Sequence, residues 1–318
     1  MRLAGIDSGG TSCRLVLCAE DGTVLSACRV PGHNPNADGF GLLEQSLRQG
    51  LQALLAPLGG QTPDALHLGA AGGSGENGAR LKVLLQTLLP GCRVSVSTDA
   101  LIALSSGLGR RDGGVLIAGT GTVGFLRQGT ALRRFGGWGW MVDEGGSGWH
   151  IGRDGFRAAM AGEDSGLPET CLTQLYEEHF GMPMARALTA LYRERLPLAD
   201  CAPLVFAACA QGDAAAEQIL RHNAACLAQT LGRMAEAFGG RCPVVLVGGL
   251  LREGSAYLTL LREQTRALPL ELILPPLPPV YGAACLAAEQ AGLPETEAFA
   301  RRFAATYQQF TEGKEQAL

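Results

Sequence analysis

The chain has 318 residues, of which 47% are hydrophobic, and its formal net charge at pH 7 is −4. A single hydrophobic core stops growing near ~250–300 residues, so this length favours two domains. The small negative charge gives no reason to expect nucleic acid or an anionic membrane as a partner. Only two of the 26 basic residues are lysines, Lys82 and Lys314, and neither completes the Gly-Lys-Ser/Thr triplet of a Walker A loop.

The ten cysteines are scattered and form no Cys-x-x-Cys pair. They are typical of small core residues in a reducing compartment, and not of a disulfide framework or a metal site. No signal peptide precedes the first expected strand, and no apolar run of ~18 residues could span a bilayer. We therefore expect a cytoplasmic protein.

The N-terminal part of the chain predicts a β-β-β-α-β-α-β-α unit. Asp21-Gly22 between apolar runs is a strong hairpin signal, so the first three strands are expected to be linked by hairpins. The expected strands are 2–7, 13–18, 23–30, 65–70 and 93–97, and the expected helices are 40–56, 79–89 and one that starts at Asp99. This order implies a mixed sheet with helices on its faces.

The second half begins with the same pattern, and helices dominate after its first strands. The longest expected helix runs from about Asp213, a plausible N-cap, to Phe238, before a double glycine. A last helix over 294–310 carries aromatic residues at 3–4 spacing and is expected to fold back onto the first lobe. The other expected elements are strands 114–118, 123–127, near 130–135 and 243–248, and a helix starting near Tyr281.

Two Gly/Thr turns carry the strongest functional signal. The first, Gly9-Gly10-Thr11, follows Asp7, and the second is Gly119-Thr120-Gly121. Glycines let backbone N–H groups approach phosphate oxygens, and threonine adds a hydroxyl donor. One such turn is also typical of an ordinary hairpin. Two of them, one beside an aspartate, indicate two lobes that bind one polyphosphate.

Two segments match the G-x-G-x-x-G pattern of dinucleotide-binding folds. Segment 119–124 is followed by a strand where the pattern requires a helix, so we discount it. Segment 73–78 does lie between a strand and a helix, but its strand is the fourth of its unit and not the start of a βαβ motif. A nicotinamide-dependent oxidoreductase remains as the weaker alternative.

A glycine-rich tryptophan loop, 136–140, precedes Asp143 and Glu144. Such a run is typical of a tight turn with exposed aromatics. It also suits a sugar site, where an aromatic face covers the ring and carboxylates bind hydroxyls. The five histidines are isolated in the sequence, and surface or core roles are expected for each.

Taken in order, the motifs resemble the actin/hexokinase/chaperone superfamily of ATP-binding folds, and within it the BadF/BadG-type ATPase family that includes N-acetylglucosamine kinases. The motifs are Gly5–Thr11, Ser97-Thr98-Asp99-Ala100, Ala118–Thr122, the Gly-Gly-Trp-Gly loop, Val244–Gly249 and Tyr281-Gly282-Ala283-Ala284. The resemblance implies an α/β, two-lobed actin-like ATPase fold with ribonuclease H-like repeats, and nucleotide and substrate in the interlobe cleft. It divides the chain into an N-terminal lobe, 1–109 completed by the helix 294–318, and a C-terminal lobe, 110–293.

The resemblance also implies roles for single residues. Asp7 matches the aspartate that acts on Mg²⁺, usually through water, and Asp99 matches the general base. The implied nucleotide-binding positions are Gly9, Gly10, Thr11, Gly119, Thr120, Gly121, Gly248 and Gly249. The implied sugar-binding positions are Asn34, Asp99, Thr122, Gly137, Trp138, Gly139, Asp143 and Glu144.

General chemistry agrees with the role of Asp99, since a base near a sugar hydroxyl is worth ~10²–10⁴-fold in rate. The competing interpretation is an N-cap at Thr98 or Asp99, and for Asp7 it is a turn aspartate that closes a hairpin.

The chain departs from the family pattern at two places, Val123 and the order Asp143-Glu144-Gly145-Gly146-Ser147. Counting from Trp138 to Ser147, Glu144 stands at the position where the family has its hydroxyl-binding aspartate. A one-residue shift of the backbone at Gly145-Gly146 would place Asp143 at that position instead.

We therefore expect an ATP- and Mg²⁺-dependent hexosamine kinase, acting on N-acetylglucosamine at its 6-hydroxyl and forming a homodimer. Glucosamine, N-acetylmuramic acid and glucose stay open as substrates. The alternative of another class is a BadF-type ATPase that activates a partner enzyme.

Overall fold

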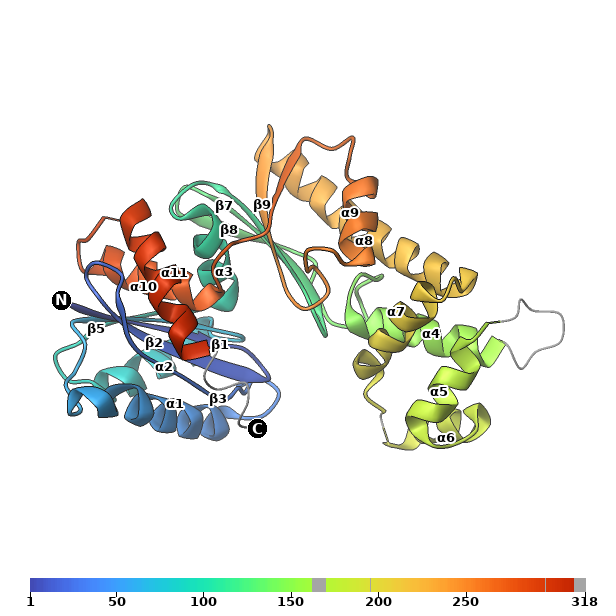
Figure 1. Ribbon diagram of the computed structural model, residues 1–318, viewed down its shortest axis with the longest axis horizontal. Coiled ribbons are helices and arrows are strands. Elements are labelled where there is room, and N and C mark those ends of the chain that lie inside the picture. The colour runs from blue at the N-terminus through green and yellow to red at the C-terminus, as the bar shows by residue number, and fades with distance from the viewer. Residues whose placement is uncertain (162–169, 195, 295, 312–318) are drawn as a thin grey trace. The chain divides into compact units, whose positions relative to one another are not determined.

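The computed structural model describes residues 1–161, 170–194, 196–294 and 296–311. The chain forms two compact units (Figure 1). Unit 1 comprises Met1–Arg111 and Pro275–Leu318, and unit 2 comprises Asp112–Leu274. Within the described residues, each unit is built on a five-stranded sheet.

Unit 1 follows the order of elements that the sequence predicts. Its strands are β1 (Arg2–Ser8), β2 (Ser12–Ala19), β3 (Val24–Pro31), β4 (Ala65–Ala70) and β5 (Arg93–Thr98). Its helices are α1 (Phe40–Leu55), the 3₁₀ turn η1 (Ala56–Leu58), α2 (Gly75–Leu88), α3 (Asp99–Leu108), α10 (Pro279–Gln290) and α11 (Glu297–Thr311). Helix α2 begins four residues before the expected start at 79, because the glycine-rich segment 75–78 is already helical.

The strand order of this sheet is β3-β2-β1-β4-β5. Strands β1, β2 and β3 pair antiparallel, whereas β1 pairs parallel with β4 and β4 with β5. The carboxyl ends of β1, β4 and β5 therefore meet at one edge, which is where open α/β sheets bind ligands.

Helices cover both faces of the sheet in unit 1 (Figure 1). Ala4 and Ile6 of β1 belong to the core cluster shared with α1 and α2, whereas Leu3 belongs to the cluster shared with α10 and α11. The alternation of side chains along a strand explains this division, since successive residues point to opposite faces.

Helix α10 belongs to unit 1, which differs from the expected boundary at 293. It packs closely on α3, and a Cβ on Gly282 would lie 1.9 Å from the Ile102 carbonyl oxygen. Only glycine allows this approach. The proline-rich connector 275–279 accordingly lies in unit 1 together with the helix that it leads into.

Helix α11 packs against the same sheet, as expected of a helix that folds back. Phe299 and Phe303 are buried in the cluster of Leu3, and the Thr306 hydroxyl accepts a hydrogen bond of 2.9 Å from the Val24 backbone N–H. Arg302 forms an ion pair with Asp21, in the turn between β2 and β3. The part of the expected segment beyond 311 lies outside the described residues.

Unit 2 repeats the topology with a helical insertion. Its strands are β6 (Gly113–Ala118), β7 (Thr122–Gln128), β8 (Ala131–Phe135), β9 (Cys242–Val247) and β10 (Leu270–Ile273). Its helices are α4 (Gly148–Ala161), α5 (Leu172–Phe180), α6 (Met184–Glu194), the 3₁₀ turn η2 (Leu198–Cys201), α7 (Ala202–Ala210), α8 (Ala214–Phe238) and α9 (Ala256–Gln264). The order β10-β9-β6-β7-β8 matches that of unit 1 strand for strand.

Helix α8 connects the sheet of unit 2 to its helical insertion within one hydrophobic core. The Asp213 side chain caps it by accepting from the Ala216 N–H at 2.9 Å, and Gly239 ends it in the left-handed conformation. Both ends agree with the sequence prediction. Among the described residues, no helix has the length and apolar character needed to cross a membrane.

We expect Phe303→Ala to lower the free energy of unfolding by ~3–5 kcal/mol, because it empties a fully buried site. The Phe303 ring centroid lies 5.0 Å from that of Tyr281 and 5.3 Å from that of Tyr307. Urea unfolding followed by circular dichroism measures the loss. Tryptophan fluorescence does not report on this unit, since Trp138, Trp140 and Trp149 all lie in unit 2.

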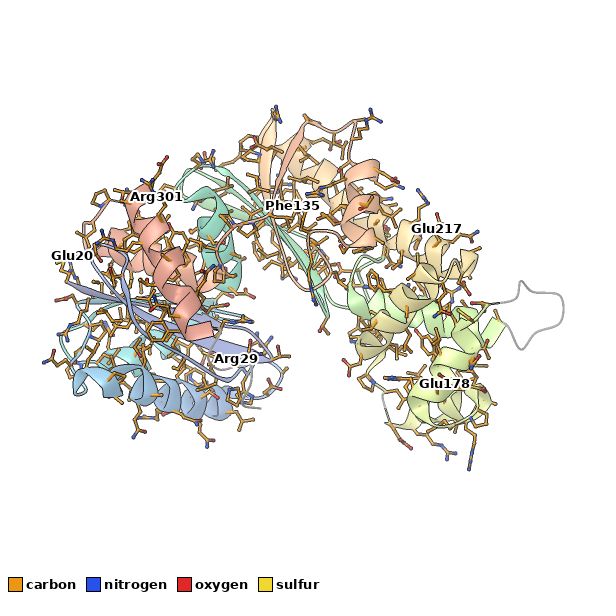
Figure 2. All side chains as sticks on the ribbon, viewed as in Figure 1. Glu20, Arg29, Phe135, Glu178, Glu217 and Arg301 are labelled. Carbon is orange, nitrogen blue, oxygen red and sulfur yellow. The ribbon has the colours of Figure 1, made fainter. Side chains whose placement is uncertain are left out.

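The control is Arg301→Ala, an exposed position on the same helix that Figure 2 labels. It should change the free energy by less than ~0.5 kcal/mol. A loss below ~1 kcal/mol for Phe303→Ala would mean that α11 does not anchor unit 1.

Candidate active site

Two aspartates lie at the carboxyl edge of the sheet in unit 1. Asp7 is near the end of β1, and Asp99 opens α3 directly after β5. Between them on β4 stands Gly69, which is in register with Asp7 on one side and with Ser97 on the other. The Asp99 carboxylate is close enough to Asp7 to disfavour ionisation of the Asp7 carboxyl.

Burial dominates the electrostatics of Asp7. It raises the pKa of the carboxyl from 3.8 to about 6, with Arg14 opposing and Asp99 reinforcing the shift. The Arg14 Nη1 lies 3.7 Å from Asp7 Oδ2. A buried carboxyl with a perturbed pKa and a cationic neighbour is typical of functional sites, so Asp7 is a candidate site residue.

Asp99 is the first residue of α3, while Thr98 occupies the N-cap position. Its Oδ1 accepts from the Ala100 N–H at 3.0 Å, and burial raises its pKa. Thr98 makes no side-chain capping bond, and its buried hydroxyl has no hydrogen-bond partner among the described residues. Thr98 and Asp99 therefore hold the positions that the capping interpretation assigns to them, but the Thr98 side chain makes no capping bond.

The first Gly/Thr turn leaves open space beside its backbone. The Gly9 N–H donates to the Ser12 carbonyl at 3.0 Å, and a Cβ on Gly10 would meet nothing within 4 Å. Thr11 is exposed. Backbone N–H groups and a hydroxyl beside open space suit an anion.

Asn34 lies in a loop of unit 1 that contacts the segment after β4. Its Oδ1 accepts from the Asn36 N–H at 3.0 Å, and Asn77 donates to Asn36 at 2.9 Å. The glycine-rich segment 73–78 thus supports the Asn34 loop.

The second Gly/Thr turn, in unit 2, is held by the start of α4. Backbone N–H groups of Gly148 and Trp149 donate to the carbonyls of Gly119 and Thr120, at 2.7 and 3.2 Å. A Cβ on Gly119 or Gly121 would meet nothing within 4 Å. This turn therefore has the same open surroundings as the first.

The double glycine Gly248-Gly249 lies beside the strand that leads into this turn. Gly248 has a φ of +110°, and its Cβ would lie 2.1 Å from the Ala118 carbonyl oxygen. No other residue type fits there. The expected adenosine-side and phosphate-side segments of unit 2 are thus neighbours.

A cavity of about 310 Å³ opens beside the tryptophan loop of unit 2. Five of the expected sugar-binding residues line it: Thr122, Gly137, Trp138, Asp143 and Glu144. The remaining lining residues are Val123, Arg134, Phe135, Gly136, Val142, Gly145, Cys226, Thr230 and Arg233. Trp138 is 64% exposed, so it is available to a ligand. Arg134 stacks on that ring at 4.4 Å.

The two acidic residues of the loop differ in their contacts. The Asp143 Oδ2 accepts from the Gly139 N–H at 3.1 Å, so this carboxylate helps to shape the loop. Gly139 thus serves the loop and does not line the cavity. The Glu144 side chain is exposed and accepts no hydrogen bond within the described ranges of the chain. Glu144 is therefore the carboxylate that is free to bind a hydroxyl.

The sequence profile of the BadF/BadG/BcrA/BcrD ATPase family matches residues 4–287. The chain belongs to this family. This result confirms the resemblance that the ordered motifs indicate. Membership of an ATPase family implies that the chain uses ATP.

Curated relatives of this ATPase are amino-sugar kinases. An N-acetyl-D-glucosamine kinase from Dictyostelium discoideum is 29% identical over 77% of this chain and 84% of its own length. A glucosamine kinase from Vibrio cholerae is 29% identical over 70% of this chain and 76% of its own. A solved structure of a candidate N-acetylglucosamine kinase from Chromobacterium violaceum has a TM-score of 0.69 at 25% identity and covers 90% of this chain and 98% of its own.

These similarities confirm the two-domain sugar-kinase fold of the actin/hexokinase type and favour a phosphotransferase over the oxidoreductase alternative. They do not test single residues. The roles of Asp7, Asp99 and the cavity residues in this ATPase therefore stay predictions that the geometry of each unit supports.

Several residues at these sites were not found from the sequence. Three of them are arginines. Arg14 is paired with Asp7, and the cavity wall includes Arg134 and Arg233. His150 is buried, in agreement with the surface or core role expected for each histidine, and its Nε2 lies 2.9 Å from the Asp143 carbonyl oxygen. One signal was available for Asn223, a polar residue within the apolar stripe of α8.

We predict that the contribution of Asp7 to the free energy of unfolding of the metal-free protein falls as the pH rises from about 4 to about 6, so that the difference in free energy between Asp7→Asn and the wild type grows over this range. The folded state favours the protonated Asp7, because the folded pKa is about 6 and the ordinary value is 3.8. Asp7→Asn lacks this group and should be more stable than the wild type near neutral pH, by up to roughly 3 kcal/mol. Urea unfolding in the presence of a chelator measures both effects.

Glu76→Gln serves as the control, since Glu76 is an exposed acidic residue of the same unit. It should leave the pH dependence unchanged. A destabilised Asp7→Asn protein near neutral pH would contradict the prediction.

Proposed function

We propose that this chain is an ATP-dependent hexosamine kinase that phosphorylates N-acetylglucosamine at the 6-hydroxyl. The observation that carries the proposal is the cavity of unit 2, where an exposed tryptophan and a free carboxylate share a wall with Thr122, the residue after the second Gly/Thr turn. Its volume of about 310 Å³ is at the lower end of the range for small-molecule sites, which suits a monosaccharide.

The chemistry proposed for the kinase is direct transfer. The sugar 6-hydroxyl attacks the γ-phosphorus, the bond to the bridging oxygen of ADP breaks, and Asp99 takes the hydroxyl proton. The raised pKa of Asp99 suits this role, since a base works best with a pKa closer to the working pH. Thr11 and Thr120, with the glycines beside them, are proposed to contact the triphosphate.

Asp7 is the proposed magnesium contact. The structure describes no group of three or more His, Cys, Asp or Glu residues that could hold a metal by themselves. Mg²⁺ is usually bound by one or two carboxylates together with substrate phosphates, so a single buried aspartate fits. When bound, the ion would neutralise charge on the transferring phosphate. The homodimer and the cytoplasmic location belong to the same proposal.

The direct test is a coupled assay of ADP release with N-acetylglucosamine, glucosamine, N-acetylmuramic acid and glucose. We expect N-acetylglucosamine to give the highest kcat/KM. A higher value for glucosamine or N-acetylmuramic acid would change the substrate but keep the class. ATP hydrolysis that no sugar accelerates would contradict a kinase and favour the partner-activating ATPase.

Asp99→Asn should lower kcat by ~100-fold or more, because it removes a general base without changing the side-chain volume. The ATP affinity, measured by isothermal titration, should stay within about twofold of the wild type. Glu217→Gln is the control, since Glu217 is also an acidic residue in the first turn of a helix but is exposed (Figure 2). If the Asp99→Asn protein keeps more than about a tenth of the turnover, Asp99 is not the base.

Glu144→Gln should raise the sugar KM about tenfold, since a charged hydrogen bond to a hydroxyl contributes roughly 1.5–3 kcal/mol. Asp143→Asn should have a smaller effect, because an asparagine oxygen can still accept from the Gly139 N–H. Steady-state kinetics with each variant separates the two. Equal sugar KM values for both variants and the wild type would show that the sugar does not bind in this cavity.

A further inference from the structure

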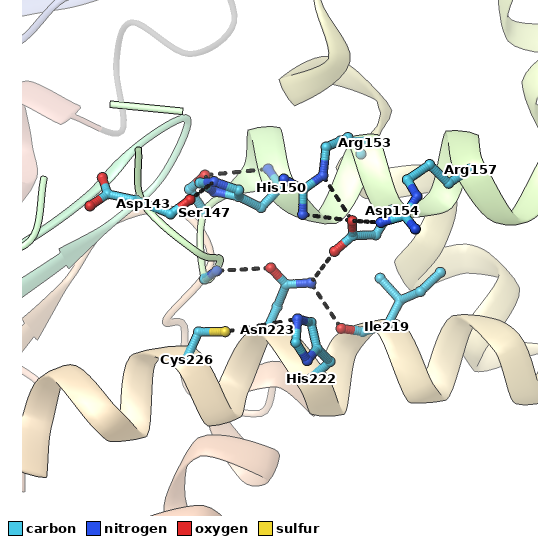
Figure 3. Close-up of polar contacts among 12 residues, drawn as sticks. Asp143, Ser147, His150, Arg153, Asp154, Arg157, Ile219, His222, Asn223 and Cys226 are labelled. Carbon is cyan, nitrogen blue, oxygen red and sulfur yellow. Dashed lines mark hydrogen bonds and ion pairs between the residues drawn. The ribbon is translucent and has the colours of Figure 1, made fainter. Parts of the chain in front are cut away.

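The segment that carries Glu144 is fixed at both ends by neutral side chains (Figure 3). On the N-terminal side, the His150 Nε2 lies 2.9 Å from the Asp143 carbonyl oxygen. On the C-terminal side, the Asn223 Oδ1 accepts from the Gly146 N–H at 2.8 Å. The Tyr257 hydroxyl donates to the Gly146 carbonyl at 3.0 Å. Only Glu144 and Gly145 lie between these anchored positions.

The orientation of Asn223 is set by a charged pair behind it. Its Nδ2 donates to Asp154 Oδ2 at 3.0 Å and to the Ile219 carbonyl at 3.0 Å. Asp154 itself is paired with Arg153 at 2.8 Å. Because a carboxylate and a carbonyl only accept, the amide nitrogen must face them, and the amide oxygen must face the Gly146 N–H.

The proton position on His150 follows from the same reasoning. The Asp143 carbonyl can only accept, so the Nε2 must carry a hydrogen. The Nδ1 lies 2.6 Å from the Ser147 hydroxyl, which also accepts from the His150 backbone N–H at 3.4 Å. The serine hydrogen is then free to donate to Nδ1, which gives a neutral ring. Burial lowers the pKa of His150, in agreement with that neutral form.

We propose that His150 is a positioning residue for the sugar-binding carboxylate, because its Nε2–H holds the Asp143 carbonyl and thereby fixes the backbone from which Glu144 lines the cavity. His150 is 1% exposed, so it acts through the loop and not on the substrate. This inference rests on the proposed hexosamine kinase function.

Two substitutions separate the hydrogen bond from the packing of the ring. In His150→Gln, the amide nitrogen can reach the place of Nε2 and donate to the Asp143 carbonyl. In His150→Asn, the shorter amide can reach the place of Nδ1 and accept from Ser147, but no donor reaches Asp143. Both variants lose the edge contact of the imidazole with Trp149, whose centroid is 5.4 Å away, so they form a matched pair.

The kinetic readout is the KM for N-acetylglucosamine compared with the KM for ATP in each variant. His150→Asn should raise the KM for N-acetylglucosamine about tenfold and leave the KM for ATP within about twofold, because a backbone anchor of the sugar loop is lost. His150→Gln should stay within about threefold of the wild type for both substrates. A structural role alone would reduce stability in both variants and would not separate them.

A second readout needs no substrate. The N–H groups of Val142, Asp143 and Gly146 are hydrogen-bonded in the structure. Their hydrogen exchange should speed up more than about tenfold in His150→Asn and not in His150→Gln. Fluorescence should change in parallel, since the protein's three tryptophans all lie at 138–149.

The outcomes distinguish the inference from the function on which it rests. A wild-type protein that phosphorylates no hexosamine contradicts the proposed function, whatever the exchange data show. A kinase in which both variants raise the sugar KM equally, or neither does, overturns the role of His150. Rescue by glutamine of both the sugar KM and the amide protection supports it.

Discussion

Parallel pairing between strands that are not consecutive in the sequence is the constraint on which both candidate sites depend. In unit 1 it joins β1 to β4 and β4 to β5, and in unit 2 it joins β6 to β9 and β9 to β10. Each set of parallel strands ends at one edge, so the turns that follow them are brought together. Asp7 and Asp99 become neighbours in this way, and so do the second Gly/Thr turn and Gly248.

The same arrangement has an electrostatic cost. Burial at the end of β1 raises the pKa of Asp7 to about 6, and Asp99 is shifted in the same direction. Folding therefore opposes the ionised forms that a metal contact and a base require. Functional sites commonly hold residues in such disfavoured states, and the stability of the surrounding core offsets the cost.

In the candidate sugar site of unit 2, buried polar side chains lie behind an exposed loop and hold it by hydrogen bonds. Trp138 and Glu144 face the cavity, whereas Ser147, His150 and Asn223 are buried behind them and bond to the loop or to each other. Buried polar groups that are fully paired favour one conformation of the backbone, because any other would leave a donor or an acceptor unpaired. An exposed loop rich in glycine can be held in place by such contacts.

The sequence predicted the α-helices and strands of unit 1, strands β6 to β9 and helix α8 of unit 2, and most candidate residues, because hydrophobic periodicity, caps such as Asp213 and Gly/Thr turns act over a few positions. Strand β10, helices α4 to α7 and the order of strands within each sheet became known only from the folded chain. The tertiary structure also placed α10 in unit 1 through a backbone contact at Gly282, and it put His150 and Asn223 behind Glu144. These contacts join residues that are far apart in the chain, or residues of a type that occurs at many other positions. Local spacing carries no information about which distant backbone groups they meet.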